Sequence, residues 1–488
     1  MRISILTAGL AVSLGVTMLP AFAAESDKHA TPNFNHDVAP ILYNNCSGCH
    51  RPGEVAPFAL LTYDDAAKRA KQIAAVTAAR FMPPWKAEPG YGHFLNERRL
   101  TDEQLATLRD WAANGAPEGD AAQKPAPPKF SDGWQIGEPD QVVKMAKPYS
   151  LPAEGADVFR CFVIPLNATD TEYVSNVEFR PGNRRVVHHA ILFLDRTGEA
   201  VKREKVPGEG YECVGGPGLA ISGGLGGWAP GATPMEYRDG VAQTIPKGAE
   251  LVMQIHYHLS GKPEEDDSQV GIKFTKTPPV KGLALITVGN ANIDIPAGED
   301  HYVVKASSTV PEDANVIAVT PHAHYLCKDM KVDATLPDGT VVPLIWIKDW
   351  DFNWQGAYRY ASPIKLPKGT QISMTYIYDN STANPRNPSN PPREVKFGEQ
   401  TTNEMAFTFV QLTLDDRGQT PEFQRYADAE FYASVLDGIL EFDEIPARQK
   451  TQLKMLMAAF DKNKNGKIDP EERQALIEFL KNMPQRPN

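Results

Sequence analysis

The stretch that decides the fold is Leu251-Val252-Met253-Gln254-Ile255-His256-Tyr257, a short run rich in apolar, β-branched and aromatic residues. Comparable runs occupy residues 316–320 and 371–378, and Pro and Gly punctuate the sequence between them. Regularly punctuated short strands are typical of β-sandwiches. Because this texture continues for too long to fit one sandwich, we expect two, over residues 134–278 and 279–423.

Helix-forming composition flanks this β-rich region on both sides. Residues 33–117 are rich in helix-favouring residues, and Thr101 with Gln104 forms a capping-box pattern at the start of one helix. A stretch rich in Pro, Ala and Gly predicts a linker over residues 118–133. Residues 424–488 are again helix-forming.

The first 24 residues have the composition of an export signal. Arg2 supplies a positive end, the run that ends at Leu19 is mostly apolar, and Ala21-Phe22-Ala23 matches the small-residue cleavage pattern. A membrane anchor is the competing interpretation, but the apolar run is short for a membrane span. We expect removal of residues 1–24 and a periplasmic or secreted protein without a membrane span.

The charge balance of the 488-residue chain excludes one class of partner. Hydrophobic residues make up 42% and charged residues 23% of the sequence, which indicates a globular protein. The formal net charge is −11, and Lys and Arg are not clustered. Because nucleic-acid binding depends on such clusters, we expect no nucleic-acid partner.

The run Cys46-Ser47-Gly48-Cys49-His50 matches the covalent haem attachment motif. Two thiols at this spacing attach the macrocycle, and the adjacent imidazole binds the iron. Met82, which precedes Pro83, is the candidate second axial ligand; a core position is its alternative, and a zinc half-site is the alternative for the cysteines. Ligation by His and Met indicates electron transfer, and residues 33–117 accordingly resemble a class I cytochrome c domain.

Five of the eleven histidines are arranged as if to bind metal ions. His188 and His189 are adjacent, His256 lies in the run quoted first, and His322 and His324 form a His-x-His pair. Side chains two residues apart on a strand share one face, so a His-x-His pair is a natural chelate. Adjacent strand residues point to opposite faces, so a shared ion at His188 and His189 requires a local distortion.

Several short motifs follow one another in a specific order and spacing. They are Cys161-Phe162, His188-His189, Trp228-Ala229, Pro246-Lys247-Gly248, Gln254-Ile255-His256-Tyr257, His322-Ala323-His324 and Glu404-Met405. With these motifs, residues 135 to about 415 resemble the copper type II, ascorbate-dependent monooxygenases. This is the family of peptidylglycine α-hydroxylating monooxygenase and dopamine β-monooxygenase.

The resemblance implies two mononuclear copper sites that face each other across a solvent-filled cleft. The electron-transfer copper would be held in the first sandwich by His188, His189 and His256. The copper that binds oxygen and hydroxylates the substrate would be held by His322, His324 and Met405. His258, on the same strand face as His256, is an alternative ligand.

The ligand chemistry favours copper on independent grounds. Imidazole suits copper, and the thioether of Met405 favours Cu(I), the state that binds oxygen. Zinc is the rival ion, because three histidines also make a catalytic zinc site. A fused redox domain argues against zinc, which has no redox role.

The resemblance also bears on the remaining cysteines. It implies a disulfide between Cys161 and Cys213, which flank the His188-His189 segment in a region where the family carries disulfides. Cys327 matches no family pattern, so it is either a free buried thiol or a group close to copper.

The substrate-binding positions depart from those of the peptide-amidating enzyme. Where that enzyme binds a substrate carboxylate, this chain has Thr320, Phe407 and Phe409. These residues offer neither positive charge nor a bidentate donor. We therefore expect an apolar or aromatic small molecule in place of peptidylglycine, unless Phe407 and Phe409 are core residues.

The C-terminal region contains the pattern of an EF-hand calcium loop over residues 461–472. Its oxygen donors would be Asp461, Asn463, Asn465, the Lys467 carbonyl, Asp469 and Glu472. Gly466 occupies the turn position, and helical runs over 453–460 and 475–480 flank the loop. The sequence predicts a structural calcium clamp.

The expected fold class is multidomain, with an all-α cytochrome c domain, two β-sandwich copper domains and a C-terminal helical EF-hand segment. The expected function is oxidation of a small organic substrate by O2, a monooxygenase reaction. Two coppers, one covalent haem c and calcium would be the cofactors, and ascorbate or a redox protein the external electron donor. The alternatives are a periplasmic electron-transfer or copper-binding protein and a zinc hydrolase.

Overall fold

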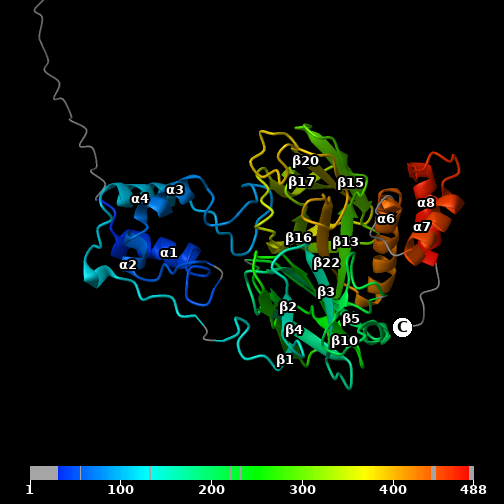
Figure 1. Ribbon diagram of the computed structural model, residues 1–488, viewed down its shortest axis with the longest axis horizontal. Helices are drawn as coiled ribbons and strands as arrows, with labels where there is room; N and C mark the ends of the chain where they lie inside the picture. Colours follow the sequence, from blue (N-terminus) through cyan, green and yellow to red (C-terminus); the bar gives the residue numbers. More distant parts are fainter. Residues whose placement is uncertain are drawn as a thin grey trace, which may run out of the picture.

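The computed structural model describes residues 31–54, 56–130, 133–219, 221–230, 232–440 and 447–482. Helices come first along the chain, a large β region follows, and helices return at the C-terminal end (Figure 1). The predicted export signal, residues 1–24, lies outside the described residues.

The N-terminal helices pack around a small apolar core. In chain order they are η1 (Phe34–Val38), α1 (Ala39–Asn45), α2 (Tyr63–Ala67), α3 (Ala70–Ala78), α4 (Asp102–Ala113) and η2 (Ala121–Gln123). Leu42, Leu108 and Trp111 are fully buried in this core. The predicted capping box is confirmed, because Thr101 and Gln104 exchange side chain-to-backbone hydrogen bonds at the start of α4.

The first half of the β region contains two five-stranded sheets with a common apolar core. The β12 sheet consists of β1 (Gln141–Lys144), β12 (Gln269–Thr275), β4 (Glu172–Arg180) and β8 (Met235–Glu236), with β9 (Gln243–Ile245) also paired to β4. The β10 sheet consists of β6 (Tyr211–Glu212), β3 (Val158–Pro165), β10 (Glu250–Tyr257), β5 (Val187–Asp195) and β7 (Gly224–Trp228). The ribbon of β2 (Tyr149–Leu151) and β11 (Glu264–Asp266) and the short α5 (Glu199–Arg203) complete this half.

The second half contains two four-stranded sheets, again with a common core. The β16 sheet consists of β13 (Gly282–Gly289), β22 (Phe407–Leu414), β16 (Ala314–His322) and β19 (Tyr358–Leu366). The β20 sheet consists of β15 (Tyr302–Thr309), β20 (Gln371–Tyr378), β17 (Cys327–Thr335) and β18 (Val341–Ile347). A ribbon joins β14 (Asp294–Ile295) to β21 (Val395–Lys396).

The strands follow the sequence pattern closely. The runs predicted over 251–257, 316–320 and 371–378 are confirmed as β10, β16 and β20. In β20 every second side chain is buried, which is the period of a strand with one face on a core. In β10 all seven residues after Glu250 are buried, so this strand runs through the interior.

The segment between α3 and α4 runs along two outer strands of the second half. The Glu88 N–H donates to the Trp346 carbonyl on β18, and the Leu95 N–H donates to the Arg359 carbonyl on β19, both at 2.7 Å. Phe94 forms an isolated bridge with Tyr360 and packs against Tyr358. Edge strands leave backbone groups unpaired, and this segment satisfies some of them on both sheets.

The expected fold class is wrong. Residues 33–117 do not form a separate all-α cytochrome c domain, because Ala87 and Phe94 belong to the apolar core of the second half. We expected two β-sandwich copper domains between helical domains. The chain is instead mainly β and consists of small sheets, with 21% helix. The apolar side chains between α3 and α4 are buried by strands far along the chain, and local composition cannot reveal such contacts.

The C-terminal helices pack against β13 and against one another. They are η3 (Arg417–Gln419), α6 (Thr420–Leu440), α7 (Ala447–Phe460) and α8 (Pro470–Asn482). Gln424 of α6 exchanges hydrogen bonds with the backbone of Leu285, which fixes this helix to β13. The helical runs predicted around the calcium loop are confirmed as α7 and α8. Of the helices that the structure describes, none combines the length and apolarity that a bilayer crossing requires.

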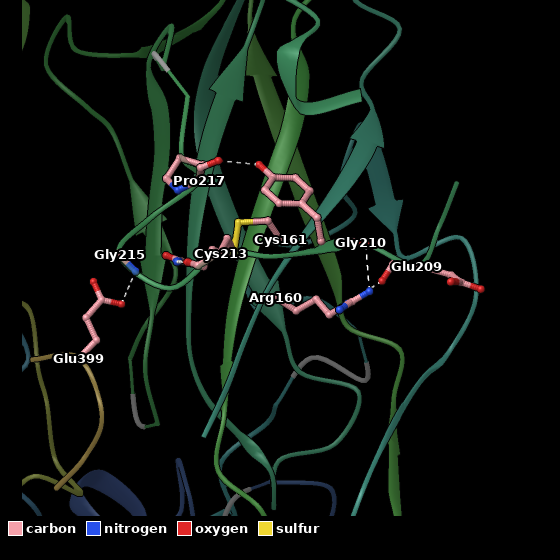
Figure 2. Close-up of a disulfide and its surroundings, with 10 residues drawn as sticks. Arg160, Cys161, Glu209, Gly210, Cys213, Gly215, Pro217 and Glu399 are labelled. Atoms are coloured by element: carbon pink, nitrogen blue, oxygen red, sulfur yellow. Dashed lines mark hydrogen bonds between the residues drawn. A yellow bond between two sulfur atoms is a disulfide. The ribbon is translucent and has the colours of Figure 1, made fainter. Parts of the chain in front are cut away.

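The disulfide implied by the resemblance is present between Cys161 of β3 and Cys213, which follows β6 (Figure 2). Gln254 of β10 donates to the Cys213 carbonyl at 2.8 Å, so the bridge is tied to the central strand of its sheet. Beyond the bridge, the Gly215 N–H donates to Glu399, which lies between β21 and β22 (Figure 2). The disulfide therefore anchors a loop that contacts the second half.

We predict that Phe94→Ala destabilises the whole β region. Phe94 is 8% exposed and packs against three aromatic rings, so its truncation should lower the free energy of unfolding by about 3–5 kcal/mol. Urea denaturation followed by tryptophan fluorescence measures this change. Phe81→Ala, at a side chain 47% exposed, is the matched control. Equal effects of the two substitutions would contradict the docking role of Phe94.

Candidate metal centre

A β-bulge brings the first three histidines together. On the β5–β10 ladder His256 pairs with His189, whereas Tyr257 pairs with Val187, so His188 is the extra residue on β5. A bulge re-aims the side chain that it leaves unpaired. The local distortion required by the sequence argument is therefore present at His188. Without it, His188 and His189 would point to opposite faces of the sheet.

The three imidazoles of this first histidine group converge on one point. The His189 Nδ1 atom lies 3.3 Å from His188 Nδ1 and 3.4 Å from His256 Nδ1. One ligand atom from each residue falls within 4.8 Å of the others, as a single metal ion requires. Burial lowers the pKa of His188 to about 3 and also that of His189, with a further contribution from His256. Neutral imidazoles at physiological pH are ready to act as ligands.

The Asp157 carboxylate contacts both His256 and His258. The carboxylate lies 3.1 Å from His256 Nε2 and 3.0 Å from His258 Nδ1. Burial raises the pKa of Asp157, but its contacts with the two imidazoles outweigh burial and hold the pKa below its usual value. A proton on Nε2 of His256 leaves Nδ1 free for a metal. His258 has a side chain 54% exposed and lies outside the convergent set, so His256 is the member of the group.

The second histidine group consists of His322 at the end of β16 and His324 just beyond it. The two rings lie 5.4 Å apart. His322 Nδ1 lies 2.6 Å from Gln355 Oε1, and His324 Nδ1 lies 3.0 Å from the Asn403 carbonyl. Both acceptors favour a proton on Nδ1, which leaves each Nε2 bare. Burial lowers the pKa of His322 to about 4, so this imidazole is neutral at physiological pH.

Glu404 holds the Met405 backbone beside His324. Its carboxylate accepts hydrogen bonds from the N–H groups of His324 (2.8 Å) and Met405 (3.2 Å). On the β16–β22 ladder His322 pairs with Phe407, and just beyond the end of this ladder Glu404 links the N–H groups of His324 and Met405. Burial raises the pKa of Glu404 to about 8, although the backbone hydrogen bonds lower it. The backbone of Met405 therefore lies close in space to that of His324, the residue two positions after His322.

One aromatic ring lies between the two histidine groups. Phe352 stacks on His188 with ring centroids 4.6 Å apart, and its ring contacts His324 edge to face at 5.4 Å. The Phe352 side chain is 3% exposed. The solvent-filled cleft implied by the resemblance is thus replaced at this point by a packed aromatic side chain.

The four predicted haem residues line one cavity of about 1450 Å³. Cys46, Cys49, His50 and Met82 are all part of its wall, together with residues of β4, β5 and β7. His50 Nδ1 lies 3.1 Å from the Phe58 carbonyl, which leaves Nε2 available to a ligand. Cys46 and Cys49 are not bonded to each other. Two free thiols, an oriented imidazole and a thioether around one cavity fit a covalently attached haem.

The predicted calcium loop has the turn that an EF-hand requires. Gly466 has a φ of 80°, which glycine adopts without strain. The carboxylate of Glu472 accepts hydrogen bonds from the N–H groups of Lys462 and Asp469, and that of Asp461 accepts one from Gly466. The carboxylates thus point into the loop over residues 461–472, and calcium binding there stays a prediction.

Two other predicted positions have packing roles. Cys327 is a buried thiol without a disulfide partner. Phe407 packs against Phe409 and against Phe431 of α6. These contacts favour the interpretation of Phe407 as a packing residue over that of a substrate-contacting residue.

The residues that orient the histidines are not among those predicted from the sequence. They are Asp157, Phe352, Gln355, Asn403 and Glu404. Only Glu404 carried a signal, because it precedes Met405 in one of the short motifs. Phe352 and Gln355 lie in the aromatic-rich run Trp350-Asp351-Phe352-Asn353-Trp354-Gln355, which belongs to none of the short motifs.

We predict that Asp157→Asn weakens metal binding by the first histidine group. Loss of an outer carboxylate that orients a ligating imidazole costs about 10–100-fold in metal affinity. Competition for Cu(I) with a chromophoric chelator measures this affinity. His258→Gln is the control, because it removes the other partner of Asp157 without removing a member of the convergent set. An equal loss in both variants would mean that His258 is a ligand.

We predict that the metal-free protein loses stability as the pH falls from about 6.5 to about 4. In this window the unfolded chain protonates imidazoles that the folded protein keeps neutral, such as that of His322. Each such histidine contributes a slope of up to about 1.4 kcal/mol per pH unit.

Urea denaturation at several pH values after chelator treatment measures this slope. His322→Gln should reduce it, whereas His301→Gln, at an exposed position, should leave it unchanged. A slope unaffected by His322→Gln would contradict the burial of a neutral imidazole.

Comparisons with known proteins do not assign the chain to a family. No family model and no curated protein matches it. Among solved structures, it is similar to PNGF-II, at 9% identity over 56% of this chain and 65% of that chain, with a TM-score of 0.22. It is also similar to infectious bursal disease virus VP2, at 11% identity over 59% and 75%, with a TM-score of 0.18. TM-scores this low indicate neither a shared fold nor a shared function, so function is inferred from the geometry of the centre.

Proposed function

We propose that this protein is a copper-dependent monooxygenase that hydroxylates a C–H bond of a small organic substrate with O2, and that a covalently attached haem supplies the electrons. The observation that supports it most is the arrangement of two groups of imidazoles, each with a ring in contact with Phe352. Each group has its own orienting residues, and both groups contact the same ring. Two sites at this separation suit two redox ions that act in one reaction.

The donor sets fit copper better than zinc. The first group offers three Nδ1 atoms, and the second offers two Nε2 atoms, with the Met405 backbone tied to that of His324 through Glu404. Imidazole binds both ions, but a thioether favours Cu(I) over zinc. The nearby cavity with its haem-attachment residues also supports a redox ion, because a hydrolytic zinc site needs no electron supply.

Bound copper would supply one-electron redox chemistry and the activation of O2, with the haem as electron source. The overall reaction consumes the substrate, O2, two electrons and two protons, and yields the hydroxylated product and water. The chain itself orients the ligands: Asp157 holds His256, Gln355 holds His322, and Glu404 holds the backbone beside His324. Phe352, which is 3% exposed, packs against one histidine of each group.

A periplasmic or secreted location belongs to the same proposal. A disulfide such as that between Cys161 and Cys213 persists in oxidising compartments, and haem attachment to cysteines fits the same setting. Calcium at residues 461–472 would stabilise the α7–α8 pair rather than take part in oxidation.

The copper- and haem-loaded full-length protein tests this proposal. We expect two coppers per chain, and ¹⁸O from labelled O2 in the alcohol formed from ethylbenzene, which we choose as an apolar probe with a weak benzylic C–H bond. Met405→Leu should abolish the labelled product, whereas His301→Gln should not.

Three results would overturn the assignment. One copper per chain would remove the two-site basis of the reaction. Reversible copper reduction without O2 consumption would favour an electron-transfer or copper-binding protein. Activity that needs zinc and no O2 would indicate a hydrolase.

A further inference from the structure

A short turn joins the cavity of the haem-attachment residues to both histidine groups. The 351–355 turn, Asp351-Phe352-Asn353-Trp354-Gln355, lies between β18 and β19. Asp351 Oδ1 accepts hydrogen bonds from the N–H and the side-chain amide of Asn353, both at 3.0 Å. The Trp354 N–H donates to the Asp351 carbonyl at 2.9 Å. These bonds hold the turn in one conformation.

Three side chains of this turn point to three different places. Trp354 lines the cavity that also contains Cys46, Cys49, His50 and Met82. Phe352 lies between His188 and His324. Gln355 contacts His322 Nδ1 through its oxygen, and its amide nitrogen donates to the Phe352 carbonyl at 3.0 Å. Five consecutive residues therefore contact the cavity and both groups.

A packing role alone does not account for this arrangement. Phe352 is buried like a core residue, but Trp354 is only partly buried and faces the cavity. The side chain of Trp354 is therefore placed to contact the haem that the proposed function assigns to this cavity. The link through Gln355 also contributes no apolar packing.

We propose that the 351–355 turn is the electron relay from the cavity to the histidine groups, with Trp354 at its entrance and Phe352 between the two groups. This inference rests on the proposed function for the identity of the redox centres. The relay carries one electron at a time: ferrous haem iron becomes ferric, and cupric copper becomes cuprous. No bond forms or breaks in this step.

Trp228 offers a competing route and therefore a matched control. It lines the same cavity, and on the β5–β7 ladder it pairs with Ala190, the residue after His189. Its ladder leads to the first histidine group, so a relay through Trp228 would enter at that group.

Photoreduction of the haem in the full-length, metal-loaded protein tests the relay. The decay of ferrous haem absorbance reports the electron-transfer rate, and the copper EPR signal reports the oxidation state of copper. Trp354→Leu should slow the transfer by about tenfold or more, which is a barrier increase of about 1.4 kcal/mol. Trp354→Phe should restore most of the rate, and Trp228→Leu should leave it unchanged.

Two static readouts separate a relay role from a structural role. The haem reduction potential and the copper EPR parameters should be the same in Trp354→Leu and in the unsubstituted protein. A slower rate with altered potentials would indicate a structural defect and overturn the relay. An unchanged rate in Trp354→Leu, a slower rate in Trp228→Leu, or no transfer in the unsubstituted protein would also overturn it.

Failure of the relay and failure of the proposed function give different results. Haem-to-copper transfer that depends on Trp354, without hydroxylated product, would support the relay and remove the monooxygenase. Labelled product, together with a haem-to-copper electron-transfer rate that is unchanged in Trp354→Leu, would support the monooxygenase and contradict the relay.

Discussion

The extra residue on β5 opposite β10 is the constraint on which the candidate metal centre depends. An unbroken antiparallel ladder would leave His188 and His189 on opposite faces, because strand side chains alternate. The register shift between His256 and Tyr257 removes this alternation at one point. All three Nδ1 atoms of the first group then converge, and His188 reaches Phe352 and, through that ring, the second group. A regular ladder would separate the two groups as well as the three ligands.

Burial of so many imidazoles requires neighbours that fix each proton. A buried polar group without a partner costs free energy comparable to a lost hydrogen bond. The structure supplies an acceptor to both rings of the second group, Gln355 to His322 and the Asn403 carbonyl to His324, and it places the Asp157 carboxylate 3.1 Å from His256 Nε2. These acceptors leave one nitrogen of each ring bare. The centre is thereby preorganised, since the protons that would compete with a metal are held on the opposite nitrogens.

The N-terminal helices and the β region are connected by more than a linker. The segment that follows α3 covers the outer strands β18 and β19, and Glu54 forms an ion pair with Arg184 at 2.7 Å. Arg184 lies just before the strand that carries His188 and His189. The cavity with the haem-attachment residues is therefore bounded by helical segments on one side and by β strands on the other. The 351–355 turn enters this cavity from the strand side.

The sequence alone determined what depends on local pattern: the strands β10, β16 and β20, the capping box at Thr101 and the helices around the calcium loop. It also identified the histidines, because imidazoles are common metal ligands and their spacing in strand-like runs suggests a shared ion. It failed on the fold class, since the burial of Phe94 by β19 joins residues far apart in the chain. Tertiary structure alone decided the bulge at His188, the convergence of His188, His189 and His256 on one point, and the position of Phe352. A register shift and a contact between distant turns leave no periodic trace in composition, so only the folded arrangement reveals them.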